Sequence, residues 1–183
     1  DSSTVLTRQV LTERNVRVVT DIVRVAPNLT IQPSFGSSAL NFALRGIGLM
    51  DFTQNNTPSV MPYMDGVAYP LSIMTSGMLF DIDGVSVSPG PAGFTHGQAT
   101  TGGEMEFHSG DPTQQFHAGI TEDIASYGRN RVEGYLSGPV SRSVSYRSAG
   151  QSLPSGRFPP YSPGQGYANA NPCAPSGKLP WQI

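Results

Sequence analysis

The chain has 183 residues, a net charge of −2 and a pI near 5.9, which exclude the basic surface of a typical nucleic-acid-binding protein. Charged residues make up 13% of the sequence, against roughly 25% in an average soluble domain, while glycine (21) and proline (16) are frequent. This composition favours short strands joined by turns, and no apolar run of about 18 residues predicts a membrane-spanning helix.

The first thirty residues predict two short helices and a strand. Thr7–Arg14 contains good helix formers and begins at Thr7, whose hydroxyl suits an N-cap. A second helix is expected to begin at Thr20 or Asp21 and to end before the next proline. Leu29–Ile31 then predicts a strand.

Two loops and two strands are expected in the next part of the chain. Ser34–Asn41 is rich in glycine and serine and predicts a loop, followed by a strand over Phe42–Gly48 that ends on Arg-Gly. Asp51–Pro58 is a polar loop, and Ser59–Val67 predicts the second strand, in which Asp65-Gly66 is a strong turn pair. Because proline has no N–H for a ladder, Pro62 predicts an edge position or a bulge there.

The segment Asp81–Phe107 predicts a strand, a tight turn, a loop and a second strand. Val85 and Val87 alternate with serines, as in a half-buried strand. Gly90-Pro91 ends that strand, and Thr101-Gly102-Gly103 forms a flexible bend before the next one.

The remainder alternates differently. Gln115–Ile124, Arg131–Ser137 and Val144–Gln151 each alternate apolar with polar or small residues and are separated by turns. Segments of about ten alternating residues are typical of transmembrane barrel strands. Leu153–Ile183 is rich in proline without alternation and predicts loop or disorder.

Four ordered elements resemble the plug domain of TonB-dependent outer-membrane receptors. They are Ala26–Ile31, Leu44-Arg45-Gly46, Tyr63-Met64-Asp65-Gly66-Val67, and Val85-Ser86-Val87 with Gly90-Pro91 and Thr101-Gly102-Gly103. The resemblance spans roughly Thr4 to Pro112. Beyond it, Tyr127–Gly134 and Ser137–Val140 are similar to the first barrel hairpins of such receptors.

The resemblance implies the fold class. Residues 1–112 are expected to form an α+β plug domain with a small mixed β-sheet and short helices. Residues 113–152 are expected to form the first antiparallel strands of a transmembrane β-barrel, and residues 153–183 a Pro/Gly-rich extracellular loop. A 22-stranded barrel needs about 220 residues at roughly ten per strand. We therefore expect an incomplete barrel and a chain that is a piece of a longer receptor.

The resemblance also implies a function. It predicts TonB-dependent transport of a nutrient ligand, such as a ferric siderophore, cobalamin or a glycan, across the bacterial outer membrane. The plug would gate the barrel lumen and contribute to ligand binding, with no catalysis and no cofactor. The implied partners are TonB with its inner-membrane energising complex, the small-molecule ligand and outer-membrane lipid, but no nucleic acid. The segment that contacts TonB would precede Asp1–Ser3, and nothing in the loops selects one ligand.

Two loops carry groups suited to binding a polar small molecule. Asp51–Asn56 and Tyr69–Met74 combine amide, hydroxyl, aromatic and thioether groups, and the resemblance places such loops at the ligand cavity. With a third loop, the candidate ligand-binding residues are Phe52, Gln54, Asn55, Tyr69, Ser72, Phe94 and His96. The resemblance also implies that Arg45 contacts the barrel. The family's second arginine and its acidic neighbour are replaced here by Pro89 and Ser86, which weakens the expected charged latch.

Two other functions remain open at this point. A soluble or surface ligand-binding or adhesion module would use the same loops without transport. A small metalloenzyme would use Glu104, Glu106 and His108, which share one face of a predicted strand, although a solvated polar face is the commoner arrangement. Cys173 is the only cysteine and lies in a proline-rich segment without catalytic neighbours.

Overall fold

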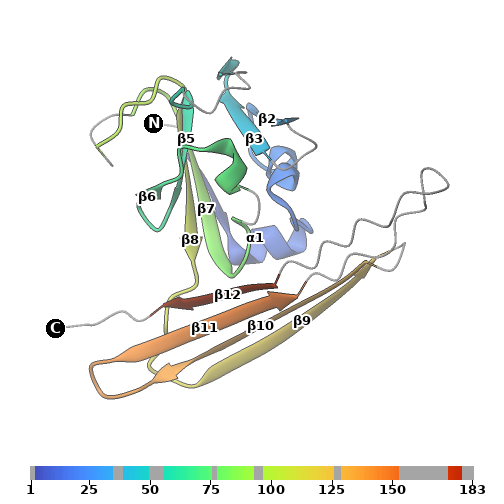
Figure 1. The fold of residues 1–183 in the computed structure, drawn as a ribbon, viewed down its shortest axis with the longest axis vertical. Helices are drawn as coiled ribbons and strands as arrows, with labels where there is room; N and C mark the ends of the chain where they lie inside the picture. Colours follow the sequence, from blue (N-terminus) through green and yellow to red (C-terminus); the bar gives the residue numbers. More distant parts are fainter. Residues whose placement is uncertain are drawn as a thin grey trace, which may run out of the picture. The chain divides into compact units, whose positions relative to one another are not determined.

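The structure is a computed structural model and describes residues 3–34, 39–49, 56–75, 78–92, 97–125, 129–152 and 173–178. The chain divides into two compact units, Asp1–Ser109 and Gly110–Ile183, each of which is described by itself (Figure 1). No helix in these described ranges is long and apolar enough to cross a membrane.

Unit 1 combines short helices with short strands. In chain order its elements are β1 (Thr4–Thr7), α1 (Arg8–Glu13), the 3-10 helix η1 (Val19–Arg24), β2 (Leu29–Ser34), β3 (Ala39–Leu44), β4 (Ile47–Gly48), β5 (Val60–Met64), β6 (Val67–Ala68), the 3-10 helix η2 (Ser72–Thr75), β7 (Ile82–Pro89) and β8 (Gly103–Ser109).

Among its described residues, unit 1 contains one mixed and one antiparallel sheet. The mixed sheet has the order β1-β7-β8-β5-β6, in which β5 and β8 are parallel and the other neighbours antiparallel. The second sheet has the order β2-β3-β4. Figure 1 shows β7 and β8 side by side in unit 1. The predicted α+β domain with a small mixed sheet is confirmed.

The core of unit 1 lies on one face of the mixed sheet. Val85 and Val87 of β7 pair with Phe107 and Met105 of β8, and all four side chains are buried. They belong to one apolar cluster with residues of the helices and of the second sheet. The alternation predicted for β7 is therefore confirmed, because every second side chain enters this cluster.

The ends of the two N-terminal helices show how closely local signals predict boundaries. Thr7 caps α1 as predicted, and Asn15 has a φ of 52°, the left-handed conformation that ends helices. The second helix begins earlier than predicted, at Val19. Asp21 still satisfies the helix start, since its carboxylate accepts hydrogen bonds from the two N–H groups before Val19.

Two stretches predicted as single strands are hairpins. Arg45-Gly46 and Asp65-Gly66 have φ values of 52° and 79°, and of 50° and 79°, respectively. Two consecutive positive φ values form the two-residue turn that matches strand twist. The strands predicted over Phe42–Gly48 and Ser59–Val67 therefore extend too far, whereas the expected ending on Arg-Gly and the turn pair Asp65-Gly66 are confirmed. Ala39–Asn41, predicted as loop, belong to β3 because they pair with β2.

Pro62 lies inside the sheet without removing a hydrogen bond to β8. It pairs with Met105 of the parallel neighbour β8, so β5 is not an edge strand as predicted. The Pro62 carbonyl accepts the N–H of Tyr69 at 2.8 Å. The carbonyl and nitrogen of one strand residue face the same side, so the missing N–H of Pro62 faces Tyr69 and not β8.

Gly103 is required by both its backbone and its surroundings. Its φ is 134°, and a Cβ there would collide with the carbonyl oxygen of Ser88 and come within 3.0 Å of Leu44 Cδ1. We expect Gly103→Ala to destabilise unit 1 by at least about 1–3 kcal/mol, the cost of holding alanine in such a conformation. Faster hydrogen exchange at the amides of β7 and β8 in the full-length protein would measure the loss.

Gly90→Ala is the matched control, since Gly90 also has a positive φ of 118° but has nothing within 4 Å of an added Cβ. We expect a smaller loss for this variant. Equal losses in the two variants would show that close packing against β7 does not contribute.

Unit 2 contains an antiparallel sheet with the order β12-β11-β10-β9 among its described residues. Its strands are β9 (His117–Ala125), β10 (Arg129–Pro139), β11 (Ser145–Ser152) and β12 (Cys173–Lys178). Three of them match the predicted alternating segments, with boundaries shifted by one to two residues. The described strands do not form a closed barrel.

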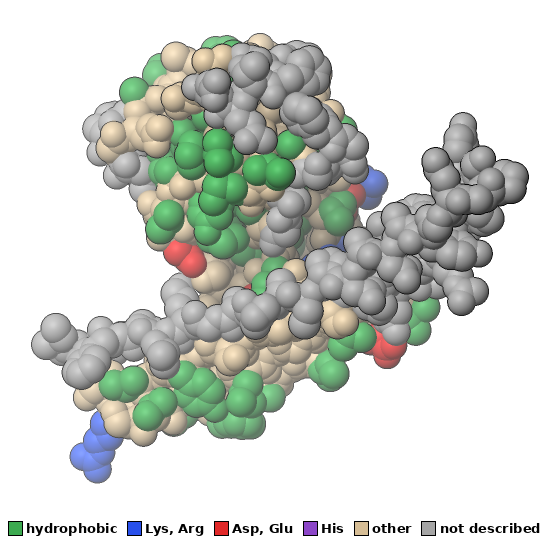
Figure 2. Space-filling view, in the orientation of Figure 1, with side chains coloured by type: hydrophobic (Ala, Val, Ile, Leu, Met, Phe, Trp, Pro, Cys, Tyr) green, Lys and Arg blue, Asp and Glu red, His purple; other side chains and the backbone are tan. Residues whose placement is uncertain are grey.

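The two faces of this sheet differ in polarity. We call the face with Ala118, Ile120, Ile124, Val132, Leu136 and Tyr146 the apolar face, although Glu122 and Ser148 also lie on it, and the face with Thr121, Asp123, Arg131, Glu133, Tyr135, Ser137, Arg147 and Gln151 the polar face. Ile120 is 80% exposed and Ile124 74%. Figure 2 shows hydrophobic side chains gathered over these strands. Arg147, in contrast, is only 7% exposed. In the sheet of a soluble protein the apolar side chains are usually buried and the polar ones exposed, so this sheet has the opposite arrangement.

β12 was not predicted from the sequence. Cys173–Lys178 lie in the segment expected to be loop, yet they pair with β11, with Pro175 opposite Gly150. Proline is tolerated in such a strand at the edge of a sheet. The strand forms by pairing with the backbone of β11, and its own sequence has no alternating pattern from which it could be predicted. The rest of the predicted extracellular loop lies outside the described residues.

Candidate functional site

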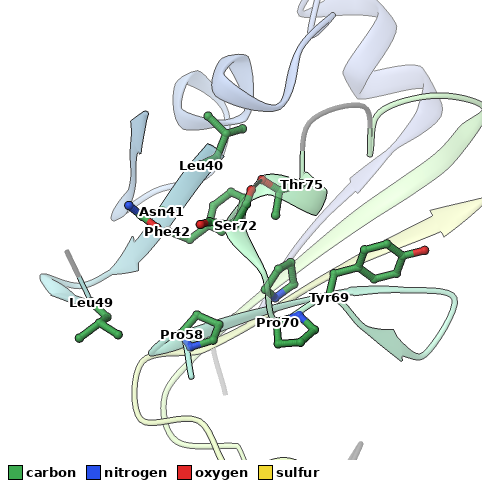
Figure 3. A pocket seen from close by; sticks show the side chains of 10 residues that line it. Leu40, Asn41, Phe42, Leu49, Pro58, Tyr69, Pro70, Ser72 and Thr75 are labelled. Carbon is green, nitrogen blue, oxygen red and sulfur yellow. Dashed lines mark hydrogen bonds between the residues drawn. The ribbon is translucent and has the colours of Figure 1, made fainter. Parts of the chain in front are cut away.

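A small pocket in unit 1 brings together residues of β3, β5, η2 and their connections (Figure 3). It is lined by Leu40, Asn41, Phe42, Leu49, Pro58, Pro62, Tyr69, Pro70, Ser72 and Thr75. Its volume is about 20 Å³, room for about one water molecule.

Short hydrogen bonds hold the loop that carries Tyr69 and Ser72. The Tyr69 N–H donates to the Pro62 carbonyl at 2.8 Å, and the Thr75 hydroxyl donates to the Ser72 carbonyl at 2.6 Å. Tyr69 is half-buried against the core, and in Figure 3 its ring points away from Ser72 and Thr75. The loop is therefore built on the sheet and presents its side chains from fixed backbone positions.

The pocket can contact the edge of a ligand but cannot enclose one. Prolines and aromatic rings form half of its lining, and Asn41 and Ser72 add hydrogen-bonding groups. On the same helix, η2, Ile73 is 49% exposed and Met74 44%. This combination of a polar notch and exposed apolar side chains suits a large ligand with both polar and apolar groups.

The structure brings together two of the predicted ligand-binding residues, Tyr69 and Ser72. The other five, Phe52, Gln54, Asn55, Phe94 and His96, lie outside the described residues. Asn41 and Phe42 were missed, because their stretch was divided between a loop and a strand. Pro58 and Pro70 belong to the predicted loops and also line the pocket, but neither indicates Asn41 or Phe42 from the sequence.

Arg45 occupies the turn between β3 and β4. It is exposed, its N–H donates to the Asn28 carbonyl at 2.9 Å, and it does not line the pocket. At the two positions where the sequence departs from the expected latch, Pro89 ends β7 and the Ser86 hydroxyl lies 3.5 Å from His108 Nε2. The contact of Arg45 with a barrel wall stays a prediction.

Glu104, Glu106 and His108 of β8 lie on the face of the mixed sheet opposite the core, near Tyr63 of β5. His108 Nε2 is 3.8 Å from Glu106 Oε2. Burial, with the neighbouring Glu104 and Glu106, raises the pKa of Tyr63 above its ordinary value, so this phenol stays neutral and can donate a hydrogen bond. In the part of the chain that the structure describes, no group of three His, Cys, Asp or Glu side chains is arranged to hold a metal ion. The arrangement does not support the metalloenzyme alternative.

Residues 1–104 match the family described as "TonB-dependent Receptor Plug Domain". The pesticin receptor of Yersinia pestis is 30% identical over 147 residues, which are 80% of this chain and 21% of that protein. The ferripyoverdine receptor of Pseudomonas aeruginosa is 26% identical over 146 residues, or 80% of this chain and 17% of that protein.

Solved structures share the fold of both units. The ferric yersiniabactin uptake receptor of Yersinia pestis aligns with 97% of this chain at a TM-score of 0.81 and 26% identity, and the alignment covers 28% of that receptor. The siderophore receptor PiuA of Acinetobacter baumannii aligns with 96% of this chain at a TM-score of 0.69 and 17% identity, covering 24% of that receptor. The chain thus spans about a fifth of the length of the curated relatives that it matches.

Proposed function

Because the chain belongs to the TonB-dependent receptors, a family of the bacterial outer membrane, we propose that it contributes the plug and the first barrel strands of a receptor that imports a ferric siderophore. Residues 1–112 would form the plug, residues 113–152 the first strands, and residues 153–183 a segment that includes an extracellular loop. The relatives described above are receptors and not enzymes.

The observation that carries this proposal is the change of polarity pattern along one chain. Unit 1 has an ordinary apolar core, whereas the sheet of unit 2 exposes Ile120 and Ile124 and covers Arg147 and Gln151. Apolar side chains on the outer face and polar ones on the inner face are what a strand in a lipid bilayer requires. A soluble adhesion module would leave this apolar face in water.

Two similar proteins support a ferric siderophore over cobalamin or a glycan. One is described as a ferripyoverdine receptor and the other as a ferric yersiniabactin uptake receptor, each 26% identical to this chain. The rim of the pocket fits such a ligand, because it offers hydroxyl and amide groups beside exposed apolar side chains. We propose that Tyr69 and Ser72 contact the ligand, together with Phe52, Gln54, Asn55, Phe94 and His96.

The proposed mechanism needs no covalent chemistry. The ligand would bind from outside, and the folded plug would close the lumen to other solutes. TonB, driven by its inner-membrane complex, would then pull on the N-terminal side of the plug and loosen it. Arg45, exposed in its turn, would contact the barrel wall.

Ser72→Ala in the full-length receptor tests the binding site. Removing one hydrogen bond of about 0.5–1.5 kcal/mol is expected to raise the dissociation constant about two- to tenfold. Fluorescence quenching by ferric yersiniabactin and by ferripyoverdine, titrated separately into the detergent-purified receptor, measures this constant.

Ser148→Ala is the control, because Ser148 is an exposed serine of β11 in unit 2. It is expected to leave binding unchanged. Equal dissociation constants for the two variants would show that Ser72 does not contact the ligand. If neither iron complex bound the unaltered receptor, and iron uptake by cells did not depend on TonB, the proposed function itself would be wrong.

A further inference from the structure

The boundary between the two units falls between two adjacent residues, Ser109 and Gly110. On the unit 1 side, the N–H and the hydroxyl of Ser109 donate to the Asp65 carboxylate at 2.9 and 2.6 Å. Asp65 is itself tied to β8, since its N–H donates to the Phe107 carbonyl at 3.0 Å. The last residue of unit 1 is thus held firmly in its own unit.

On the unit 2 side, Gly110 lies against the guanidinium of Arg147. A Cβ at Gly110 would come within 2.6 Å of Arg147 Nε and Cζ. The φ of Gly110 is not in the left-handed region, so glycine is needed here for space and not for backbone conformation. Arg147 is only 7% exposed.

Arg147 is in turn supported by an aromatic ring. Its Cζ lies 4.2 Å from the centre of the Tyr135 ring, within cation–π range. A Cβ at Gly119 of β9 would approach Tyr135 Cε1 to 2.5 Å, so the ring covers this glycine. Gly119, Tyr135, Arg147 and Gly110 therefore form a continuous stack on the polar face.

Three residues after Gly110, Thr113 makes a second contact with the strands of unit 2. The Thr113 N–H donates to the Ser137 hydroxyl at 2.9 Å, and the Thr113 hydroxyl donates to the Gln115 carbonyl at 2.7 Å. Ser137 is fully buried, and its hydroxyl donates to the Tyr146 carbonyl at 3.1 Å. The Ser137 hydroxyl both accepts and donates a hydrogen bond, and it thereby holds the segment at Thr113 to β10 and β11.

We propose that Arg147, Tyr135 and Ser137 form a clasp that keeps Gly110–Thr113 on the polar face of the strands when the plug is loosened. The inference builds on the proposed function, in which force enters from the N-terminal side of the plug. The clasp would fix the opposite end, so that rearrangement stops at Ser109 and the plug can return after transport. Arg147, Tyr135 and Ser137 are positioning residues and do not touch the ligand.

Gly110→Ala in the full-length receptor, reconstituted in lipid vesicles, tests the clasp. The added methyl group displaces the flexible end of Arg147 without straining the backbone. We expect hydrogen exchange in the segment 110–116 to accelerate at least tenfold, and Ser137→Ala to have the same effect.

Gly150→Ala is the matched control, because nothing lies within 4 Å of a Cβ at this glycine of β11. It is expected to leave exchange in the segment 110–116 unchanged. Unchanged exchange in Gly110→Ala, or equal acceleration in Gly150→Ala, would overturn the clasp even if iron uptake proceeded normally. Iron uptake by the unaltered receptor judges the proposed function separately.

Discussion

Ile120→Arg is expected to make the protein less stable in a lipid bilayer by as much as about 2–4 kcal/mol, the cost of arginine on a lipid-facing strand near the bilayer midplane. Ile120 is 80% exposed and lies in the middle of β9, with Ile124 on the same face. A charged guanidinium there would replace an apolar side chain among Ala118, Val132 and Leu136, with the carboxylate of Glu122 two residues along β9 on the same face. Denaturant titration of the full-length protein in phospholipid vesicles measures the change.

Thr121→Arg provides the comparison, because the side chain of the adjacent residue lies on the polar face. Thr121 is exposed and pairs across the strands with Glu133, which can accept hydrogen bonds from an arginine. We expect a cost of no more than about 1 kcal/mol. If the two arginines cost the same, or if Thr121→Arg cost more, the apolar face would not face lipid.

Phe107→Ala is expected to destabilise unit 1 by about 3–5 kcal/mol, the usual cost of truncating a buried phenylalanine. Phe107 is fully buried in β8, between the strands β5 and β7 that pair with it at Met64 and Val85. Its ring belongs to the apolar cluster, and the neighbouring strands cannot move inward to fill the space without breaking their ladders. Hydrogen exchange of β7 and β8 in the full-length receptor is expected to accelerate on the order of a hundredfold or more.

Phe116→Ala makes the same chemical change at a side chain that is 67% exposed. The free energy of opening of β7 and β8, derived from their hydrogen-exchange rates, is expected to stay within about 0.5 kcal/mol of the value in the unaltered protein. A similar acceleration in both variants would mean that the effect of Phe107→Ala does not come from the core of unit 1.

Local signals predicted the turns of this chain only where the residue types are distinctive. Asp65-Gly66 is a strong turn pair, yet the predicted strand was continued through it to Val67. Arg45-Gly46 adopts the same turn although arginine carries no turn signal. What places Arg45 there is the pairing of β3 with β4 and the hydrogen bond from its N–H to Asn28, seventeen residues earlier in the chain.

The candidate site was predicted in part for a similar reason. Tyr69 and Ser72 were selected because their loop carries aromatic and hydroxyl groups, and they line one pocket. Asn41 and Phe42 come from a strand almost thirty residues earlier, and only the packing of β3 near η2 brings them to that loop. No spacing in the sequence records this contact.

The alternation of β7, β9, β10 and β11, the cap of α1 and the ordered plug motifs could be predicted, because each depends on residues that are neighbours along the chain. The orientation of the Pro62 nitrogen away from β8, the strand Cys173–Lys178 and the packing of Arg147 over Gly110 could not be predicted. These features depend on contacts between distant segments. Such contacts form only after the local elements are in place, so no short sequence pattern encodes them.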